Sequence, residues 1–239
     1  MCDDSGIAVG AALAVHHNIL GHPLPDSRPA WSSPYLGPIH PYGEVIEAFT
    51  AAGDAINVER CKDAADQAAQ DLAESKIVAW YEGGSEAGPR ALGHRSLLAD
   101  PRDKDMWDRV NQVKGREAWR PLAPVVLEEH AADWFSGVAL PSPYMLFNAD
   151  VRSVGISAVT HVDGTARIQT VNDSSGDYFK LVSGFHQRTG VPVLLNTSLN
   201  SPGEPIVESP AEAVGFLLRS RVDVLYLSGH RVTRSIERD

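Results

Sequence analysis

Three polar segments of the chain hold the residue types that could bind an anionic ligand. The first, residues 82–96, combines four glycines with Arg90 and Arg95. Glycines let backbone N–H groups approach a ligand, and arginine supplies planar pairs of donors that match phosphate or carboxylate. The segment lacks both the Gly-Lys-Ser/Thr of a P-loop and the Gly-x-Gly-x-x-Gly dinucleotide spacing. It predicts an anion site of another kind, with a tight turn carrying surface arginines as the alternative.

The second segment, residues 112–124, clusters Lys114, Arg116 and Arg120 at the end of a helical pattern. Basic residues at a helix C-terminus can simply complement the helix dipole. Three cations within seven residues also repel one another unless an anion joins them. The sequence alone leaves both interpretations open.

The third segment, residues 194–207, places uncharged polar residues directly after an apolar strand pattern: Asn196, Thr197, Ser198 and Asn200. Ligands of open α/β sheets gather at the carboxyl ends of strands. Hydroxyl and amide side chains there suit a sugar, a carbonyl group or phosphate oxygens. A turn-rich loop without a ligand is the alternative.

Arg167 adds a further candidate cation on a predicted strand. It lies two residues from Gln169, so both side chains share one face of the strand. An inward-facing arginine there would need an anion. The turn at Asp163-Gly164 explains the rest of this segment structurally.

The elements expected to position these segments alternate between strand and helix. Apolar runs predict strands at 76–82, 96–100, 121–129, 144–150, 153–162, 165–171, 191–196 and 223–228. Helical patterns cover 44–52, 60–75, 103–113, 130–135, 177–188 and 210–219. A hairpin between 153–162 and 165–171 interrupts the alternation. This combination favours an α/β fold with a mixed sheet and helices packed on it.

Composition and charge exclude several classes of protein. The chain has 239 residues, 43% of them hydrophobic, which suits one large or two small globular domains. Its net charge of −10 disfavours nucleic acid as a partner, although residues 90–120 carry an excess of three positive charges. This basic island in an acidic chain indicates a pocket for a small anion. The longest apolar run, Gly6–Val15, is too short to span a membrane and follows no basic region, so no membrane association is expected. Cys2 and Cys61 suit reduced thiols, and we expect a cytoplasmic location.

Five motifs in order resemble the carboxyl-terminal half of NodU/CmcH-type O-carbamoyltransferases. They are GSEAGPRALGHRSLLADPR, GREAWRPLAPVV, HVDGTARIQTV, GVPVLLNTSLNSPGEPIV and DVLYLSG. The resemblance runs from about Ser33 to about Gly229. It implies a YrdC-like twisted mixed sheet flanked by helices over residues 33–239, and ATP and carbamoyl phosphate as ligands that give carbamoyl adenylate.

The resemblance also implies roles for individual residues. YrdC-like proteins share a Lys-x-Arg…Ser-x-Asn tetrad, matched here by Lys114, Arg116, Ser198 and Asn200. These four are the expected catalytic residues. The expected phosphate or substrate ligands are Arg90, Arg95, Arg120, Arg167, Asn196 and Thr197. Mg²⁺ is expected as the partner of ATP.

The amino end departs from the family pattern. Residues 1–32 are similar to the tail of an actin-like domain, and Asp4 matches an aspartate that ligates iron or zinc there. The two metal-binding histidines have no counterpart, so Asp4 would need that domain as a partner. The apolar segment near it would pack on that domain or on a second copy in a homodimer. A non-catalytic nucleotide- or RNA-binding module, or a docking subunit, is the alternative function.

Overall fold

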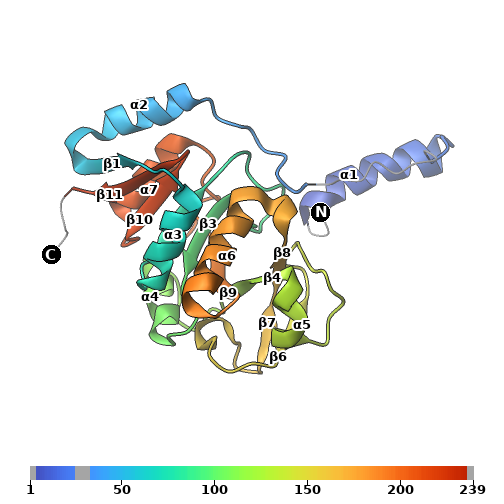
Figure 1. Cartoon of the computed structure of the whole chain (residues 1–239). Helices are drawn as coiled ribbons and strands as arrows, with labels where there is room; N and C mark the ends of the chain where they lie inside the picture. The colour runs from blue at the N-terminus through green and yellow to red at the C-terminus, as the bar shows by residue number, and fades with distance from the viewer. Residues whose placement is uncertain (1–3, 25–32, 236–239) are drawn as a thin grey trace.

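An eight-stranded mixed sheet runs through the centre of the molecule (Figure 1). The computed structural model describes residues 4–24 and 33–235. The strand order is β1-β11-β10-β2-β3-β9-β4-β8. The strands are β1 (Ile56–Arg60), β2 (Val78–Tyr81), β3 (Arg95–Ala99), β4 (Ala123–Leu127), β8 (Gln169–Val171), β9 (Val193–Ser198), β10 (Val224–Leu227) and β11 (His230–Arg234). The pairs β10–β2 and β4–β8 are parallel and the others antiparallel, so the predicted mixed sheet is confirmed.

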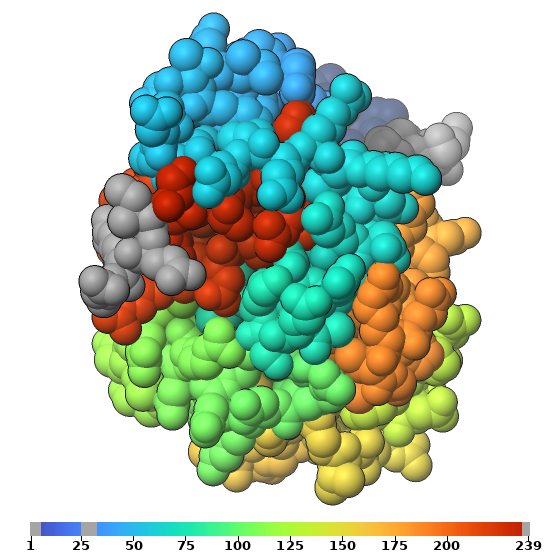
Figure 2. All heavy atoms as spheres, turned by 60° about the vertical axis from the view of Figure 1, so that its left-hand side comes forward, coloured from blue at the N-terminus to red at the C-terminus, as the bar shows by residue number. Residues whose placement is uncertain are grey.

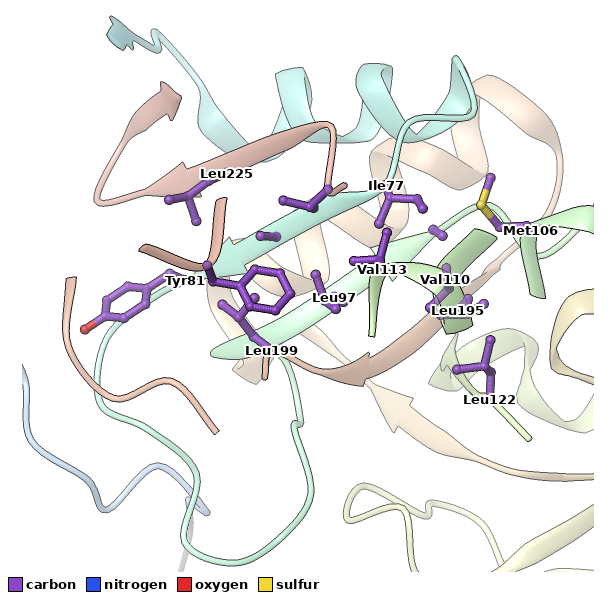
Figure 3. Packing of buried hydrophobic residues seen from close by; sticks show 14 of the residues in the cluster. Ile77, Tyr81, Leu97, Met106, Val110, Val113, Leu122, Leu195, Leu199 and Leu225 are labelled. Carbon is purple, nitrogen blue, oxygen red and sulfur yellow. The ribbon is translucent and has the colours of Figure 1, made fainter. Parts of the chain in front are cut away.

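Helices cover both faces of this sheet. Alternating strand residues face opposite sides, and Val78 and Ala79 accordingly belong to different apolar clusters. On one face lie α3 (Ala64–Ala73) and α6 (Gly176–Thr189), side by side in Figure 2. On the other face lie α2 (Tyr42–Ala52), α4 (Asp105–Val113) and α7 (Pro210–Arg219). Figure 3 shows residues of α4 packed with Leu97 of β3 and Leu195 of β9.

A second, three-stranded antiparallel sheet corrects one prediction. It contains β5 (Phe135–Ser136), β6 (Asn148–Val151) and β7 (Thr165–Arg167). The expected strand over 153–162 is wrong, because this segment forms bends and the short 3₁₀ helix η4 (Ser157–Val159). Ile156 and Val159 are nevertheless buried, so the apolar residues of this segment reach the core without forming a strand. The partner of β7 is therefore β6.

Short helical turns complete the chain. They are η2 (Gly53–Ala55), η3 (Glu128–His130), α5 (Ala131–Trp134) and η5 (Asp173–Ser175). The helix expected over 60–75 starts later, because Arg60 ends β1 and the Asp63 side chain caps α3 by accepting from the N–H of Asp66 at 3.0 Å.

The amino-terminal helix stands apart from the sheet in Figure 1. It comprises α1 (Asp4–Ala14) and η1 (Val15–Ile19), and η1 buries no residue. The division into 1–32 and 33–239 stays a prediction, since 25–32 lie outside the described residues. Within the described parts of the chain, every helix is too short or too polar to cross a bilayer.

Candidate functional site

Lys114 and Arg116 lie in the turn that ends α4. The N–H of Gly115 donates to the carbonyl of Gln112 at 3.0 Å, and the N–H of Arg116 donates to the carbonyl of Asn111 at 3.1 Å. This pair of bonds is the Schellman arrangement, which favours glycine at its left-handed position. Gly115 fills that position with φ of +57°. The turn brings both basic side chains to one cavity.

We expect Gly115→Ala to lower the free energy of unfolding by about 1–2 kcal/mol. A side chain at this left-handed φ is strained, and its Cβ would lie 3.1 Å from Cγ of Pro202. Gly43→Ala is the matched control, because Gly43 lies in α2 with open space around it. Urea unfolding of both variants measures the effect, and an unchanged midpoint for Gly115→Ala would contradict the turn described here.

The end of β9 supplies the other half of the predicted tetrad. The Lys114 ammonium donates to the Ser198 carbonyl, to Ser198 Oγ at 3.1 Å and to Asn200 Oδ1 at 2.7 Å. Ser198 Oγ in turn donates to Asn200 Oδ1 at 2.7 Å. The structure therefore brings these three residues into direct contact. Lys114 fastens the helix end to the strand end.

Lys114 is buried among neutral acceptors. Burial lowers the pKa of its ammonium to about 7, and the nearby Arg116 guanidinium lowers it further. The pKa of Arg116 is also lowered, first by burial and then by Arg120. The Arg116 guanidinium is held by Asn111, whose Oδ1 accepts from Nε at 2.7 Å. This orienting role of Asn111 is not apparent from the sequence.

A cavity of about 460 Å³ opens over this contact. Lys114, Arg116, Ser198 and Asn200 line it together with Arg120. Arg120 is half-exposed and pairs with Glu117 at 2.8 Å, so it lies at the edge with its own counterion. The predicted tetrad thus shares one cavity with Arg120.

A smaller pocket of about 90 Å³ adjoins the cavity, because Arg116 and Ser198 line both. Arg90 and Arg167 line it as well, and so does Thr197. The pKa of Arg167 falls to about 10 through burial and through the charges of Arg90 and Arg116. Arg90 and Arg116 therefore lie close enough to Arg167 to disfavour its charge.

No carboxylate within the described residues forms an ion pair with Lys114, Arg90, Arg116 or Arg167. Lys114 is buried and Arg116 and Arg167 are half-buried, whereas Arg90 is exposed. Buried or half-buried cations are normally paired. Converging cations without acidic partners are the arrangement expected of an anion site.

Asn196 is one of the residues that line the smaller pocket. Its side chain is fully buried in β9. The Nδ2 amide donates to the carbonyl of Ala91 at 3.1 Å and to Gln169 Oε1 at 2.8 Å. Asn196, Thr197 and Ser198 thus all line this pocket at the end of β9.

The structure places Arg95 away from the other predicted site residues. Its side chain is 0% exposed and its guanidinium lies 3.6 Å from the centre of the Tyr81 ring. It donates to backbone carbonyls, including those of Glu82 at 2.6 Å and Gly83 at 3.0 Å. Arg95 lines neither of these two cavities and supports the glycine-rich loop from inside.

A third cavity, of about 450 Å³, shares Ser198 and Asn200 with the first and is acidic. Glu86 and Glu208 line it. Glu86 Oε1 accepts from the N–H groups of Leu92 at 2.7 Å and His94 at 2.8 Å, which holds the glycine-rich loop in place. The sequence argument missed Glu86, although a lone acid between glycines and arginines was a visible signal.

The structure does not test the prediction that Asp4 ligates a metal ion. Its side chain lies outside the described residues, so the prediction stays open. Elsewhere in the described residues, no group of three or more His, Cys, Asp or Glu side chains could hold a metal ion.

Residues 69–234 match the family model described as "Carbamoyltransferase C-terminus". The chain belongs to this carbamoyltransferase family. It is 43% identical to the nodulation protein NolNO of Sinorhizobium fredii over 97% of this chain and 35% of that protein. It is 46% identical to the 3'-hydroxymethylcephem-O-carbamoyltransferase of Amycolatopsis lactamdurans over 62% of this chain and 29% of that enzyme. The chain therefore spans about a third of the length of these two family members.

Solved structures agree with the fold expected from the resemblance. The chain superimposes on T. kodakarensis HypF with a TM-score of 0.51 and 16% identity, over 76% of this chain and 23% of that one. It superimposes on E. coli YciO with a TM-score of 0.50 and 16% identity, over 67% of this chain and 75% of that one. These likenesses confirm the YrdC-like fold of this family member.

Proposed function

We propose that the cationic cavity binds ATP and carbamoyl phosphate and forms carbamoyl adenylate, from which a carbamoyl group passes to a hydroxyl acceptor. The observation that carries the proposal is the convergence of Lys114, Arg116, Ser198 and Asn200 on one cavity of about 460 Å³, with Lys114 and Arg116 lacking ionic partners among the described residues. Membership of a carbamoyltransferase family supports the class of group transferred.

The residue types suit this chemistry. Water first splits carbamoyl phosphate into carbamate and inorganic phosphate. Attack of a carbamate oxygen on the α-phosphorus of ATP then forms a new O–P bond, breaks the bond to pyrophosphate and gathers negative charge. Such a reaction depends on positioning and on cationic stabilisation. Lys114 and Arg116 would hold the carbamoyl and phosphate oxygens. Ser198 and Asn200 would orient the nucleotide phosphates from the end of β9.

We propose that Mg²⁺ enters this site as part of the nucleotide complex. The described residues offer no cluster of three metal-binding side chains. Mg²⁺ in nucleotide sites is commonly held by phosphate oxygens and water with few protein ligands. The ion would neutralise phosphate charge, and this chain would supply the cations around it.

Pyrophosphate release tests the proposal. We expect the wild type to release pyrophosphate from ATP and Mg²⁺ only when carbamoyl phosphate is present. Lys114→Met should abolish the signal, because it removes the cation at the centre of the tetrad. Arg109→Ala is the matched control, since Arg109 lies on α4 but donates to Ser75 and Asp223 away from the cavity.

Two results would contradict the proposal in different ways. No pyrophosphate together with no binding of either ligand would refute the site. Nucleotide binding without pyrophosphate release would favour the non-catalytic binding or docking subunit instead.

A further inference from the structure

The segment between the amino-terminal helix and α2 contacts the glycine-rich loop of the site. Residues 33–37 of this segment form a strap over the loop, which comprises residues 82–96. The strap lines none of the three cavities described above. It can therefore affect a ligand in these cavities only through the loop that it contacts.

The strap is bonded to the part of the loop that precedes Arg90. The N–H of Ala87 donates to the carbonyl of Pro34 at 2.7 Å. The N–H of Gly37 donates to the carbonyl of Ser85 at 3.0 Å. These bonds join backbone to backbone, so they fix the path of the loop directly.

The strap is also bonded to the part of the loop that follows Arg90. The Tyr35 hydroxyl donates to the carbonyl of Leu92 at 2.9 Å. The Tyr35 ring stacks on the His94 imidazole, with ring centres 3.4 Å apart and planes 2° from parallel. His94 Nδ1 in turn donates to the carbonyl of Gly84 at 2.7 Å. Tyr35 thus supports both parts of the loop at once.

The backbones of strap and loop also pack against each other without a side chain between them. A Cβ at Gly84 would lie 2.5 Å from the carbonyl oxygen of Gly37. This distance is shorter than any ordinary contact between such atoms, so a glycine at position 84 allows the approach. The strap therefore fits this loop closely over its whole width.

Arg90 depends on this support. Glu86 Oε1 closes the loop by accepting from the N–H groups of Leu92 and His94. Arg90 lies between Glu86 and Leu92 and is exposed, so burial does not fix its side chain. Its position at the 90 Å³ pocket depends on the backbone that carries it. Segments with few contacts open readily, and the strap supplies contacts on both sides of Arg90.

We propose that the strap holds the glycine-rich loop in the conformation that presents Arg90 to the anionic ligand, with Tyr35 as the positioning residue. The effect on ligand affinity rests on the proposed function. When the loop opens, only the closed fraction of the protein binds, so the apparent affinity falls in proportion to that fraction. Coupling of this kind is reciprocal, so a ligand that favours the closed loop must also favour the docked strap.

Calorimetric titration with ATP and hydrogen exchange of the loop test the proposal. Tyr35→Ala removes the stack and the hydroxyl bond, so it should weaken ATP binding at least about 5-fold and speed exchange in the loop. Tyr35→Phe keeps the ring, and the Leu92 carbonyl still accepts from Gln169 at 2.8 Å, so most of the affinity should return. Tyr42→Ala is the matched control, because Tyr42 also stacks on a histidine but lines none of these cavities, and it should change neither measurement.

The wild type supplies a second measurement. Saturating ATP should slow hydrogen exchange of the strap while exchange of the edge strand β1 stays unchanged. Wild-type affinity in Tyr35→Ala would overturn the proposal and leave the proposed function intact. Should Tyr35→Ala fail to fold, strap exchange that ATP does not alter would overturn it instead. Absence of ATP binding by the wild type would overturn the proposed function and this proposal together.

Discussion

Replacing Arg116 with alanine is expected to weaken ATP binding about 10- to 150-fold while the protein stays folded. A charge-assisted contact to phosphate in a half-buried site contributes roughly 1.5–3 kcal/mol, and 1.4 kcal/mol corresponds to one decade of affinity. Arg116 lines both the 460 Å³ cavity and the 90 Å³ pocket, and Asn111 holds its guanidinium in place. It belongs to no apolar cluster.

Calorimetric titration with ATP measures this loss against two references. Ser198→Ala removes a neutral hydroxyl, so it should cost only about 0.5–1.5 kcal/mol of binding. Arg109→Ala removes an equal charge from α4 outside the cavity and should leave the affinity unchanged. Wild-type affinity for ATP in both Arg116→Ala and Ser198→Ala would refute the assignment of the site.

The location of the site was predictable because its two halves end regular elements. The glycine after Lys114 predicts a helix end, and the polar run after Leu195 predicts the carboxyl end of a strand. Both signals are local in the sequence. Tertiary packing determines that the end of α4 faces the end of β9. The 2.7 Å contact between Lys114 Nζ and Asn200 Oδ1 was therefore not predictable from the sequence.

Arg95 shows where local signals fail. Arg90 and Arg95 occupy the same glycine-rich loop, and their residue type predicts the same role. The structure separates them, because Arg95 opens β3 and its side chain lies over Tyr81 of the neighbouring strand. The direction of a side chain at a strand end depends on register, and register is a tertiary property.

The strands at one edge of the sheet were missed for a different reason. In β1 only Ile56 is buried, and in β11 the sequence HRVTR contains a single apolar residue. Strands with so little buried surface leave no apolar run or clean alternation to detect. The interior strands β2 and β10, buried along their whole length, were predicted because every residue contributes to the apolar pattern.

Lys114 should make the stability of the protein rise with pH between about 7 and 10. Burial lowers the pKa of the folded-state ammonium to about 7 from a model-peptide value of 10.5. Between these values the unfolded chain holds a proton that the folded protein lacks, so raising the pH favours the folded state. The slope for one such group is at most about 1.4 kcal/mol per pH unit. Below pH 7 both states are protonated and the dependence ends.

Lys114→Met isolates this contribution, since methionine has a similar length and no titrating group. Urea unfolding of both proteins at pH 6, 7, 8 and 9 should give a difference in stability that grows in favour of the wild type above pH 7. Curves of equal slope across this range would show that the lysine keeps its proton throughout and that any pH dependence comes from another group.

The affinity for ATP should depend on pH in the opposite direction to the stability of the protein. An anion beside the Lys114 ammonium favours its charged form, so the complex holds a proton that the free protein has lost above pH 7. The affinity of the wild type for ATP should therefore fall as the pH rises from 7 to 9, and Lys114→Met should show a flat profile. Titrations in buffers of different ionisation enthalpy report the proton taken up. Uptake near pH 8 in the wild type and none in the variant would place the anion against Lys114, whereas equal uptake in both would place it elsewhere.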